Sequence, residues 1–353
     1  MKVLVAMSGG VDSSVAAGLL VEQGHEVVGA TLKLWGGVSD SGCCSVADVD
    51  DARRVAQTLG IDHHVFNYAE EFERHVVEPF VAAHAAGRSP NPCIECNRHI
   101  KFDLLFERAR RLGFDAVATG HHARVEHRGD VSVLARGADA RKDQSYVLGY
   151  LRDAELSMLL LPIGTLHKSE VRAHAERLGL RTWDKPDSQD VCFIEATKGR
   201  EVFLRQRIAL TPATLVERVS GEVVGATSAV QLMTVGQRRG VLPGRDGVKR
   251  YVARVDVANA TVEIGRLEDV VVTSLALDAA SLSFVREPLG DGAGVLAQWS
   301  AHGAVQPATL RHDGDWRLEL ESPARPVAAG QSVVFYRLDD PAIVVGAAIV
   351  TLP

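Results

Sequence analysis

The stretch Lys2–Ser13 reads KVLVAMSGGVDS and predicts a strand, a glycine-rich turn and the start of a helix. Its first part, Lys2–Met7, is apolar almost without interruption, which is typical of a strand buried on both faces of a parallel sheet. Apolar residues then recur with helical spacing from Val11, and Gly24 ends the helix. The turn therefore aims backbone N–H groups and the positive end of a helix dipole at one point, which favours a bound phosphate.

The residues of the turn indicate which kind of phosphate site this is. A Walker A loop carries Lys before its Ser or Thr, but this chain has Asp12 there, and the turn does not follow the dinucleotide pattern G-x-G-x-x-G. Two hydroxyls, from Ser8 and Ser13, and a carboxylate suited to Mg²⁺ fit a pyrophosphate leaving group. The alternative is a tight turn with an ordinary helix cap. We favour the phosphate site because the turn directly follows a buried strand.

The composition restricts the class of protein. The chain has 353 residues, enough for two or three domains, and 46% hydrophobic and 24% charged residues, as in ordinary globular proteins. With 39 Lys and Arg against 45 Asp and Glu, the net charge is -6, so a nucleic acid would need a local basic patch. Neither a signal peptide nor an apolar stretch of about 18 residues is evident, so we expect a cytoplasmic protein with no membrane partner.

Strand and helix signals alternate up to about residue 122. Strands are expected at 25–34, 61–68 and 115–120, and helices after Ser45, through 72–80 and from Asn97 to Gly113. Such alternation predicts an α/β fold with a doubly wound parallel sheet, whose ligands bind at the carboxyl ends of the strands. Ser8, Gly120 and His121 lie at such ends, so we expect them to face one pocket.

The pattern changes after residue 123. Hairpins are expected at 125–134 and 216–224, and helices from Lys142 and over 167–178. From about residue 275, short alternating runs separated by turns predict a small antiparallel barrel. We therefore divide the chain into a catalytic domain, residues 1–198, a small central domain, residues 199–268, and a C-terminal β-barrel, residues 269–353. Between 236 and 254 lies a basic patch that is a candidate RNA contact, although such clusters are usually solvated surface. Its members are Arg238, Arg239, Arg245, Lys249, Arg250 and Arg254.

The five cysteines, Cys43, Cys44, Cys93, Cys96 and Cys192, are an odd number in a chain without export signals. In a reducing compartment they favour catalysis or metal binding over a disulfide framework. Cys96 is expected immediately before a helix N-terminus, where the dipole favours the thiolate. We therefore consider Cys96 a candidate nucleophile and Cys192 its partner, and we assign no role to Cys43 and Cys44.

Three interpretations of these cysteines compete. Two reactive thiols could pass sulfur to a carbon activated by ATP. Alternatively, Cys93, Cys96 and Cys192 could hold a metal ion or an iron–sulfur cluster, although a lone C-x-x-C pair is a weak signal for structural zinc. Thirdly, they could be buried apolar residues, as free cysteines often are. We favour sulfur transfer.

Several motifs follow one another in a fixed order along nearly the whole chain. They are SGGVDS, GCCS, NPCIECN, ATGHHARV, KDQSYVL, DKPDSQDVCFI, TVGQRRG and AAGQSVVFY. This set resembles the bacterial and organellar tRNA-specific 2-thiouridylases, which are ATP pyrophosphatases. The resemblance implies an adenine nucleotide alpha hydrolase-like domain, a central domain and a β-barrel. It also implies replacement of O2 of the wobble uridine by sulfur, in tRNAs for Lys, Glu and Gln, with ATP and Mg²⁺.

The resemblance also implies roles for individual residues. Cys192 would receive a persulfide from a sulfur-relay protein or a cysteine desulfurase, and Cys96 would attack it, releasing sulfide or forming a Cys96–Cys192 disulfide. The implied ATP-binding residues are Ala6, Met7, Ser8, Gly9, Gly10, Val11, Asp12, Ser13, Leu32 and Gly120. The implied tRNA contacts are His121, Lys142, Asp143, Gln144 and Gln331.

Other functions remain open at this point. An adenylating amidotransferase or ligase of the same superfamily would use the turn but would not need Cys96 and Cys192. An iron–sulfur-dependent tRNA thiolase would need them as cluster ligands. A nucleotide-gated RNA-binding protein would bind tRNA without releasing AMP.

Overall fold

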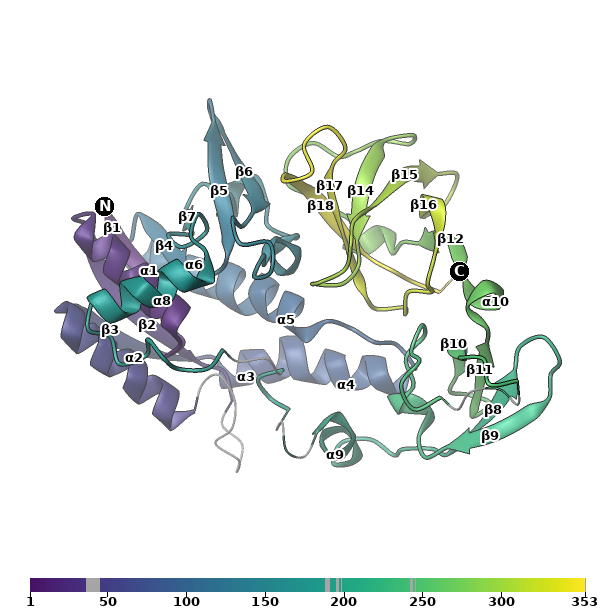
Figure 1. Cartoon of the computed structure of the whole chain (residues 1–353). Helices are drawn as coiled ribbons and strands as arrows, with labels where there is room; N and C mark the ends of the chain where they lie inside the picture. Colours follow the sequence, from purple (N-terminus) through teal and green to yellow (C-terminus); the bar gives the residue numbers. More distant parts are fainter. Residues whose placement is uncertain are drawn as a thin grey trace.

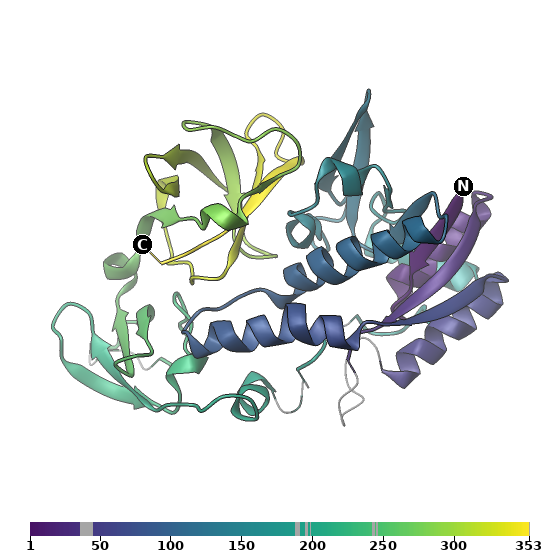
Figure 2. The same cartoon turned by 180° about the vertical axis from the view of Figure 1, so that it is seen from behind.

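The computed structural model describes residues 1–35, 45–187, 191–194, 197, 199–241, 244 and 246–352. Figure 1 shows three parts along the chain: a layered N-terminal part, a small sheet and a curled C-terminal sheet. Figure 2 shows from behind that the long helical segment ending in α4 runs from the first part toward the small sheet. Among the described residues, no helix is both long and apolar enough to cross a membrane.

The N-terminal sheet has five strands, all parallel, in the order β3-β2-β1-β4-β7. The first strand lies in the middle, with β2 on one side and β4 on the other, so the strand order reverses there. Open α/β sheets bind their ligands beyond the strand ends at such a point. Val3, Leu4 and Val5 are completely buried, which confirms a strand covered on both faces. The strands are β1 (Lys2–Ala6), β2 (Glu26–Lys33), β3 (Asp62–Asn67), β4 (Ala116–Thr119) and β7 (Leu159–Leu160).

Helices cover both faces of this sheet, as the doubly wound prediction requires. On one face, Val3 and Val5 pack with α1 (Val11–Glu22), α2 (Val46–Leu59) and α8 (Lys168–Arg177). On the other face, Leu4 packs with two long helical segments. These segments are α3 (Ala69–Phe72), η1 (Glu73–Val77) and α4 (Glu78–Ala85), then α5 (Pro92–Glu95), η2 (Cys96–Leu104) and α6 (Leu105–Arg111).

Two helix starts test the predictions from capping residues. The α2 helix begins after Ser45, whose hydroxyl accepts the N–H of Asp48 in a capping box, as predicted. The predicted helix start at Asn97 is wrong. The helical segment begins at Pro92, because Asn91 caps it by accepting the N–H of Cys93 at 3.0 Å and Pro92 favours the first helical position. The side chain of Asn97 instead donates to the carbonyl of Val147 at 2.9 Å.

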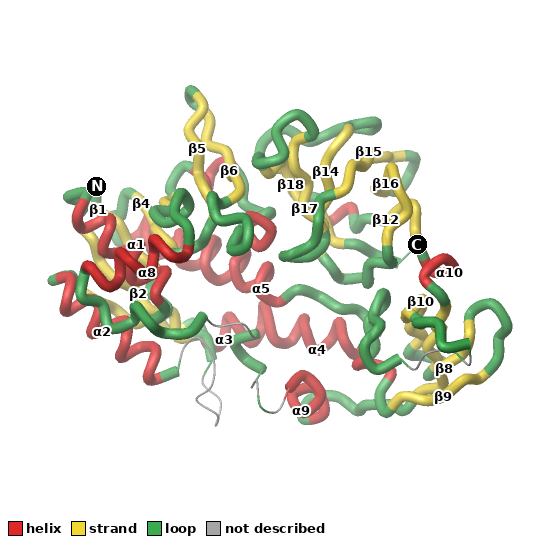
Figure 3. The backbone as a smooth tube through the Cα atoms, viewed as in Figure 1, coloured by secondary structure: helices red, strands yellow, loops and turns green. Residues whose placement is uncertain are grey.

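A hairpin and short helices follow β4. The hairpin strands are antiparallel and turn at Gly129, close to the predicted range. Figure 3 shows mostly loops and short helices between this hairpin and α8. The elements of this region are β5 (Ala123–Arg128), β6 (Val131–Arg136), η3 (Ser145–Leu148) and α7 (Asp153–Leu156).

The central part has a four-stranded sheet in the order β10-β11-β8-β9. Its own core contains Leu215, Val230, Val252, Val262 and Ile264. The domain boundaries at 198 and 268 stay predictions. The elements are α9 (Gly199–Arg205), β8 (Ala213–Glu217), β9 (Val223–Thr227), η4 (Val230–Leu232), β10 (Tyr251–Asp256), β11 (Thr261–Gly265) and α10 (Leu267–Val270).

The C-terminal part is a curled antiparallel sheet of seven strands in the order β12-β16-β15-β14-β17-β18-β13. A bridge between Leu277, just beyond β12, and Val350, just beyond β18, brings its two sides together and supports the barrel prediction. The elements are β12 (Val272–Ala276), η5 (Ala279–Ser281), β13 (Ser283–Phe284), β14 (Gly294–Gln298), β15 (Gln306–His312), β16 (Trp316–Ala324), β17 (Ser332–Arg337) and β18 (Val344–Ile349).

Candidate active site

The glycine-rich turn lies at the carboxyl end of β1, where the strand order reverses. The helix α1 starts at Val11 with Gly10 as its N-cap, and no side chain caps it. The first N–H groups of a helix have no partner within the helix. Because α1 starts just beyond the carboxyl end of β1, its first N–H groups lie at that end of the sheet. The hydroxyl oxygens of Ser8 and Ser13 lie 3.3 Å apart, and the Ser13 hydroxyl also accepts the N–H of Ser8 at 3.1 Å. The turn thus offers backbone and hydroxyl donors at one point, which fits a phosphate group.

Two glycines let the backbone around this turn approach closely. Gly9 has a φ of 72°, and a Cβ there would lie 2.2 Å from the carbonyl oxygen of Asp48. A Cβ on Gly120, just after β4, would lie 2.5 Å from the backbone nitrogen of Ser13. The turn is therefore held between α2 and the end of β4. The remaining implied ATP residue, Leu32, lies buried in β2.

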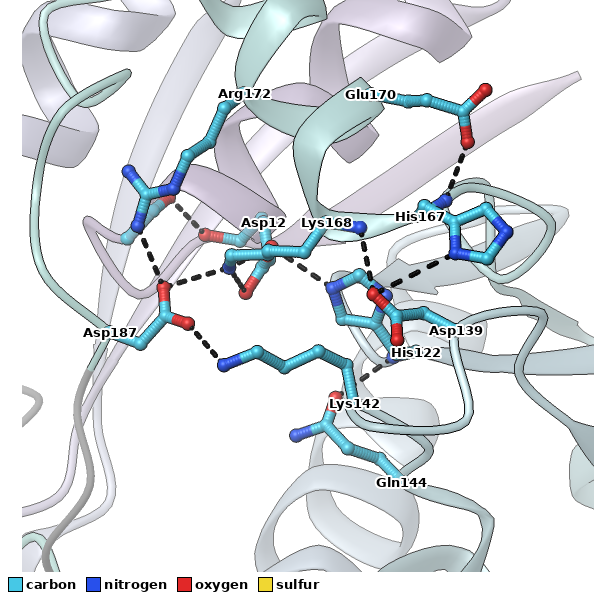
Figure 4. Close-up of polar contacts among 12 residues, drawn as sticks. Asp12, His122, Asp139, Lys142, Gln144, His167, Lys168, Glu170, Arg172 and Asp187 are labelled. Atoms are coloured by element: carbon cyan, nitrogen blue, oxygen red, sulfur yellow. Dashed lines mark hydrogen bonds and ion pairs between the residues drawn. The ribbon is translucent and has the colours of Figure 1, made fainter.

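The carboxylate of Asp12, in the first turn of α1, is the centre of a charged network (Figure 4). The ammonium of Lys168 donates to both of its oxygens, at 2.6 and 2.7 Å, and Nε2 of His122 lies 3.2 Å from Oδ1. Burial alone would raise the pKa of Asp12, but the hydrogen bonds from His122 and Lys168 outweigh it and lower the pKa. Both oxygens of Asp12 accept hydrogen bonds from this ammonium, and the Mg²⁺ expected on Asp12 stays a prediction.

Asp187 is the second anion of the network. It accepts hydrogen bonds from Lys142 at 2.7 Å and Arg172 at 3.2 Å, and its Oδ1 lies 2.9 Å from Nζ of Lys168. Burial raises the pKa of Asp187, but the hydrogen bonds from Lys142 and Lys168 outweigh it and bring the pKa to about 2. Asp187 thereby joins its own segment to α8 and to the loop that carries Lys142, beside the turn.

Lys185 ties the turn itself to α2. Its ammonium donates to the carbonyl of Gly9 at 2.9 Å, to Asp48 at 2.7 Å and to Asp51 at 2.8 Å. Lys185 and Asp187 belong to one short segment, which continues toward Cys192. This segment therefore connects the phosphate turn with a candidate catalytic cysteine.

The loop between β6 and η3 carries three implied tRNA contacts. The carboxylate of Asp143 is almost buried and accepts from Arg136 at 2.8 Å, from the N–H of Gly137 at 2.9 Å and from the hydroxyl of Ser145 at 2.8 Å. Asp143 therefore shapes the loop. Gln144 accepts the N–H of His122 at 2.8 Å, and Lys142 points to Asp187 (Figure 4).

The other two implied tRNA contacts lie elsewhere. His121 is buried after β4, with Nδ1 2.7 Å from the hydroxyl of Thr119, and burial lowers the pKa of its ring well below the usual value. Gln331 precedes β17 and donates to the carbonyl of Ser89 at 2.5 Å, on the loop that leads to Cys93 and Cys96. The neighbour of His121, His122, joins the 142–144 loop to Asp12, whereas Gln331 contacts the loop that precedes Cys93 and Cys96.

The structure describes Cys93, Cys96 and Cys192, whereas Cys43 and Cys44 of the GCCS motif lie outside the described residues. Cys96 is only 7% exposed and belongs to the main hydrophobic cluster, against which Cys192 packs; Cys93 is exposed. The structure does not support the implied Cys96–Cys192 disulfide, and the turnover step that would form it stays a prediction.

The alternative in which Cys93, Cys96 and Cys192 hold a metal ion or an iron–sulfur cluster requires these side chains to lie together. Within the described part of the chain, no three His, Cys, Asp or Glu side chains are grouped so that they could hold a metal ion. Cys93, Cys96 and Cys192 therefore do not form a ligand set in this arrangement. Cys93, not Cys96, lies in the first turn of the helical segment, because that segment begins at Pro92.

The basic patch is smaller than the sequence indicates. Arg250 is buried and paired with Glu217 at 2.9 Å, and Arg254 lies 3.4 Å from Asp256. These two arginines are engaged within the central part, and Arg245 lies outside the described residues. Exposed members are Arg238, Arg239, Lys249 and Arg254.

Sequence reasoning missed Lys168, Asp187 and Lys185 as parts of the site. Lys185 and Asp187 stand inside the DKPDSQDVCFI motif, so the motif itself was the available signal. Lys168 opens a helix without any local signal, and its partner Asp12 lies 156 positions earlier. Only the packing of α8 beside α1 reveals this pair.

Fold and site together define an α/β protein with a phosphate turn, a central small sheet and a C-terminal barrel. A family model described as the tRNA methyl transferase HUP domain matches residues 1–196, and one described as the tRNA methyl transferase PRC-barrel domain matches residues 201–266. The tRNA-specific 2-thiouridylase MnmA of Mycolicibacterium smegmatis is 45% identical over 349 residues, covering 96% of each chain. That of Salinispora tropica is 45% identical over 360 residues, covering 99% of this chain and 98% of its own. The chain belongs to the family of tRNA-specific 2-thiouridylases.

A solved structure with partial likeness is the U34-tRNA thiolase NcsA from Methanococcus maripaludis with its [4Fe-4S] cluster. It is 18% identical, with a TM-score of 0.36, and the match covers 54% of this chain and 61% of that one. A likeness at this level carries no argument about the site.

Proposed function

We propose that this protein replaces O2 of the wobble uridine of tRNA with sulfur, in tRNAs for Lys, Glu and Gln, by adenylating that oxygen with ATP. Its relatives are named tRNA-specific 2-thiouridylases over nearly their full length. The observation that supports the proposal most is the hydrogen bond from Lys185 to the Gly9 carbonyl of the phosphate turn. Lys185 belongs to the same motif, DKPDSQDVCFI, as the candidate sulfur carrier Cys192. One motif thus contains both a residue at the phosphate turn and the cysteine proposed to deliver sulfur.

ATP fits the turn at the end of β1. The uncapped first turn of α1 and the Ser8 and Ser13 hydroxyls supply donors for the phosphates, and Gly9 and Gly120 let α2 and the end of β4 pack closely against the turn. We assign the nucleotide to residues 6–13, Leu32 and Gly120. ATP converts the uridine oxygen into a good leaving group, and AMP and pyrophosphate are its products.

The sulfur reaches the uridine through two cysteines. Cys192 receives it as a persulfide from a sulfur-relay protein or a cysteine desulfurase. The thiolate of Cys96 attacks Sγ of Cys192, the S–S bond of the persulfide breaks, and the outer sulfur leaves as hydrosulfide, which attacks C2 of the adenylated uridine and expels AMP. The Cys96–Cys192 disulfide that remains is reduced by an external thiol before the next turnover. Cys96 belongs to the main hydrophobic cluster, and Cys192 packs against it. Because Cys96 is buried, the turn that carries Cys192 has to bring the persulfide to it inside the protein.

tRNA binds beside the network. Lys142 and Gln144 are presented by a loop that Asp143 shapes, and Gln331 approaches from the barrel. His121 is buried beside Thr119, and burial lowers the pKa of its ring, so we assign it to the inner wall of the tRNA site rather than to a phosphate contact. Asp143 therefore contributes to tRNA binding through the shape of its loop.

The test combines purified protein, ATP, an unmodified tRNA for Glu and a persulfide donor, with the digested tRNA analysed by mass spectrometry. We expect 2-thiouridine with the wild type and none with Cys96→Ser or Cys192→Ser. Mass spectrometry distinguishes sulfur replacement from the methylation that the name of the matched family model suggests. A methylated product, or thiolation by both serine variants, would contradict the proposal.

A further inference from the structure

The phosphate turn has no lysine of its own, and the structure supplies one from another helix. At the position before Ser13, where a Walker A loop carries Lys, this chain has Asp12. The ammonium of Lys168 lies on this carboxylate, with its nitrogen 2.6 and 2.7 Å from the two oxygens. A cation is therefore present beside the turn, although the turn itself contributes an anion.

Packing of α8 holds Lys168 in this position. Lys168 is the first residue of α8, and its backbone N–H donates to Asp139 at 3.0 Å. Val171 and Ala175, further along α8, are completely buried in the cluster that also contains α1. The ammonium, only 13% exposed, is therefore delivered from a rigid element and not from a solvated loop.

The contacts of the ammonium indicate which partner it can exchange. It has three N–H donors, and its three acceptors are both oxygens of Asp12 and one oxygen of Asp187, at 2.9 Å. Asp187 also has hydrogen bonds from Lys142 and Arg172, so it stays neutralised if Lys168 leaves it. Asp12 has only His122 besides Lys168 among its charged contacts in the described residues. Lys168 can therefore give up its contact with Asp187 at a lower cost than its contacts with Asp12.

We propose that Lys168 is a phosphate-binding residue that takes the part of the missing loop lysine. Asp12 holds the ammonium beside the turn, and a phosphate oxygen of the leaving pyrophosphate replaces Asp187 as its third acceptor. This inference rests on the proposed use of ATP at the turn.

The variant Lys168→Met tests this by binding, without any turnover. Isothermal titration with inorganic pyrophosphate, and separately with ATP, compares it with the wild type and with Arg177→Met. Arg177 is the last residue of the same helix and pairs with Glu22 at the protein surface, so it controls for loss of a positive charge from α8. The dissociation constants for both ligands should rise about 10- to 100-fold in Lys168→Met, the range for hydrogen bonds to charged groups. Arg177→Met should match the wild type.

A second variant tests whether pyrophosphate replaces Asp187 on Lys168 or is only attracted by the positive charge of Lys168. Asp187→Asn removes the competitor for the third donor of Lys168, so we expect pyrophosphate to bind at least as tightly as to the wild type, whereas Lys168→Met weakens it. Circular dichroism and thermal unfolding show whether each variant is folded. Lys168→Met should fold, because Asp12 keeps His122 and Asp187 keeps Lys142 and Arg172.

The outcomes separate this inference from the proposed function. Unchanged pyrophosphate and ATP affinities in a folded Lys168→Met variant would overturn the role of Lys168, even if the wild type binds ATP and thiolates tRNA. Weaker pyrophosphate binding by Asp187→Asn would overturn the exchange. A wild type that binds neither ATP nor pyrophosphate would refute the proposed use of the turn.

Discussion

Gly120 shows at the scale of one residue how closely the phosphate turn is enclosed. A Cβ at this position would lie 2.5 Å from the backbone nitrogen of Ser13, and backbone cannot rotate away as a side chain can. We therefore expect Gly120→Ala to displace the first turn of α1 and to raise the dissociation constant for ATP by on the order of 10-fold, measured by titration calorimetry. Gly290→Ala is the control, since nothing lies within 4 Å of its Cβ. Equal ATP affinities in the two variants would contradict the enclosed turn.

Asp187 predicts a pH dependence of stability. The pKa of its carboxyl falls from the usual 3.8 to about 2 because, although burial raises it, Lys142 and Lys168 outweigh burial. A lowered pKa in the folded state contributes stability that is fully present above the unfolded pKa and is lost as the pH falls through the folded pKa. The wild type should therefore be more stable than Asp187→Asn above about pH 4, by on the order of 1 kcal/mol because the site is partly exposed to solvent.

Thermal unfolding of both proteins between pH 2 and 6 measures this difference. The gap between their unfolding midpoints should narrow from about pH 4 downward and close near pH 2. A gap that stays constant through this range would show that the carboxylate of Asp187 is not stabilised by its cationic partners.

At the scale of elements, Phe193 anchors the turn that carries Cys192. Its ring is 4% exposed, with its centroid 5.1 Å from that of Phe203, 5.3 Å from that of Phe80 and 5.8 Å from that of Phe72. Phe193→Ala removes roughly 3 kcal/mol of packing, so the turn should lose its fixed position. We expect persulfide on Cys192, measured by intact mass spectrometry, to transfer to tRNA at least about 10-fold more slowly, with ATP affinity unchanged.

The conservative variant Phe193→Leu controls for this effect. It keeps an apolar side chain in the cluster and should retain most of the transfer rate. Transfer at the wild-type rate in Phe193→Ala would mean that the aromatic cluster does not position the sulfur.

The elements also show where prediction from sequence succeeds and where it stops. The strand before the turn, the Ser45 capping box and the parallel sheet follow from local pattern, because burial and capping depend on neighbours in the sequence. The helix start at Asn97 was wrong, because Asn91 and Pro92 offered a cap and a first position six residues earlier. Both candidates are good caps, and only the tertiary contact of Asn97 with Val147 decides between them.

The pairing of residues within the charged network could not be predicted. Its pairs join Asp12 to Lys168 and Gly9 to Lys185, residues separated by 156 and 176 positions. Such pairs depend on which helices pack beside which strand, and no local pattern contains that information. The implied residues of the turn itself came from the motif, and whether each binds ATP stays a prediction.

At the scale of the whole molecule, Arg136 joins the N-terminal part to the barrel. Its guanidinium donates to Asp143 at 2.8 Å and to Gln298 of β14 at 2.7 Å, and it lies 3.9 Å from the ring centroid of Tyr336 in β17. The loop that carries Lys142 is therefore shaped by a contact with the barrel. We expect Arg136→Met to raise the dissociation constant for tRNA about 10-fold or more, with ATP affinity unchanged, as fluorescence anisotropy and calorimetry would measure.

Gln298→Ala removes the same contact from the other side. If the two residues act as one link, the double variant should weaken tRNA binding by less than the sum of the single effects in free energy. If the two single effects on the free energy of tRNA binding were fully additive in the double variant, Arg136 and Gln298 would not act as one link. A loss of ATP affinity in Arg136→Met would contradict a role of this link in tRNA binding alone.

The central claim is that one site couples ATP cleavage to sulfur transfer, and a single-turnover experiment tests it most directly. Protein loaded with persulfide on Cys192 is mixed with ATP and unmodified tRNA for Glu, and AMP and 2-thiouridine are quantified in the same samples over time. We expect the two products in equal amounts, with no thiolation when ATP is omitted. Thiolation without ATP, or AMP formed without 2-thiouridine by the loaded protein, would contradict the coupling.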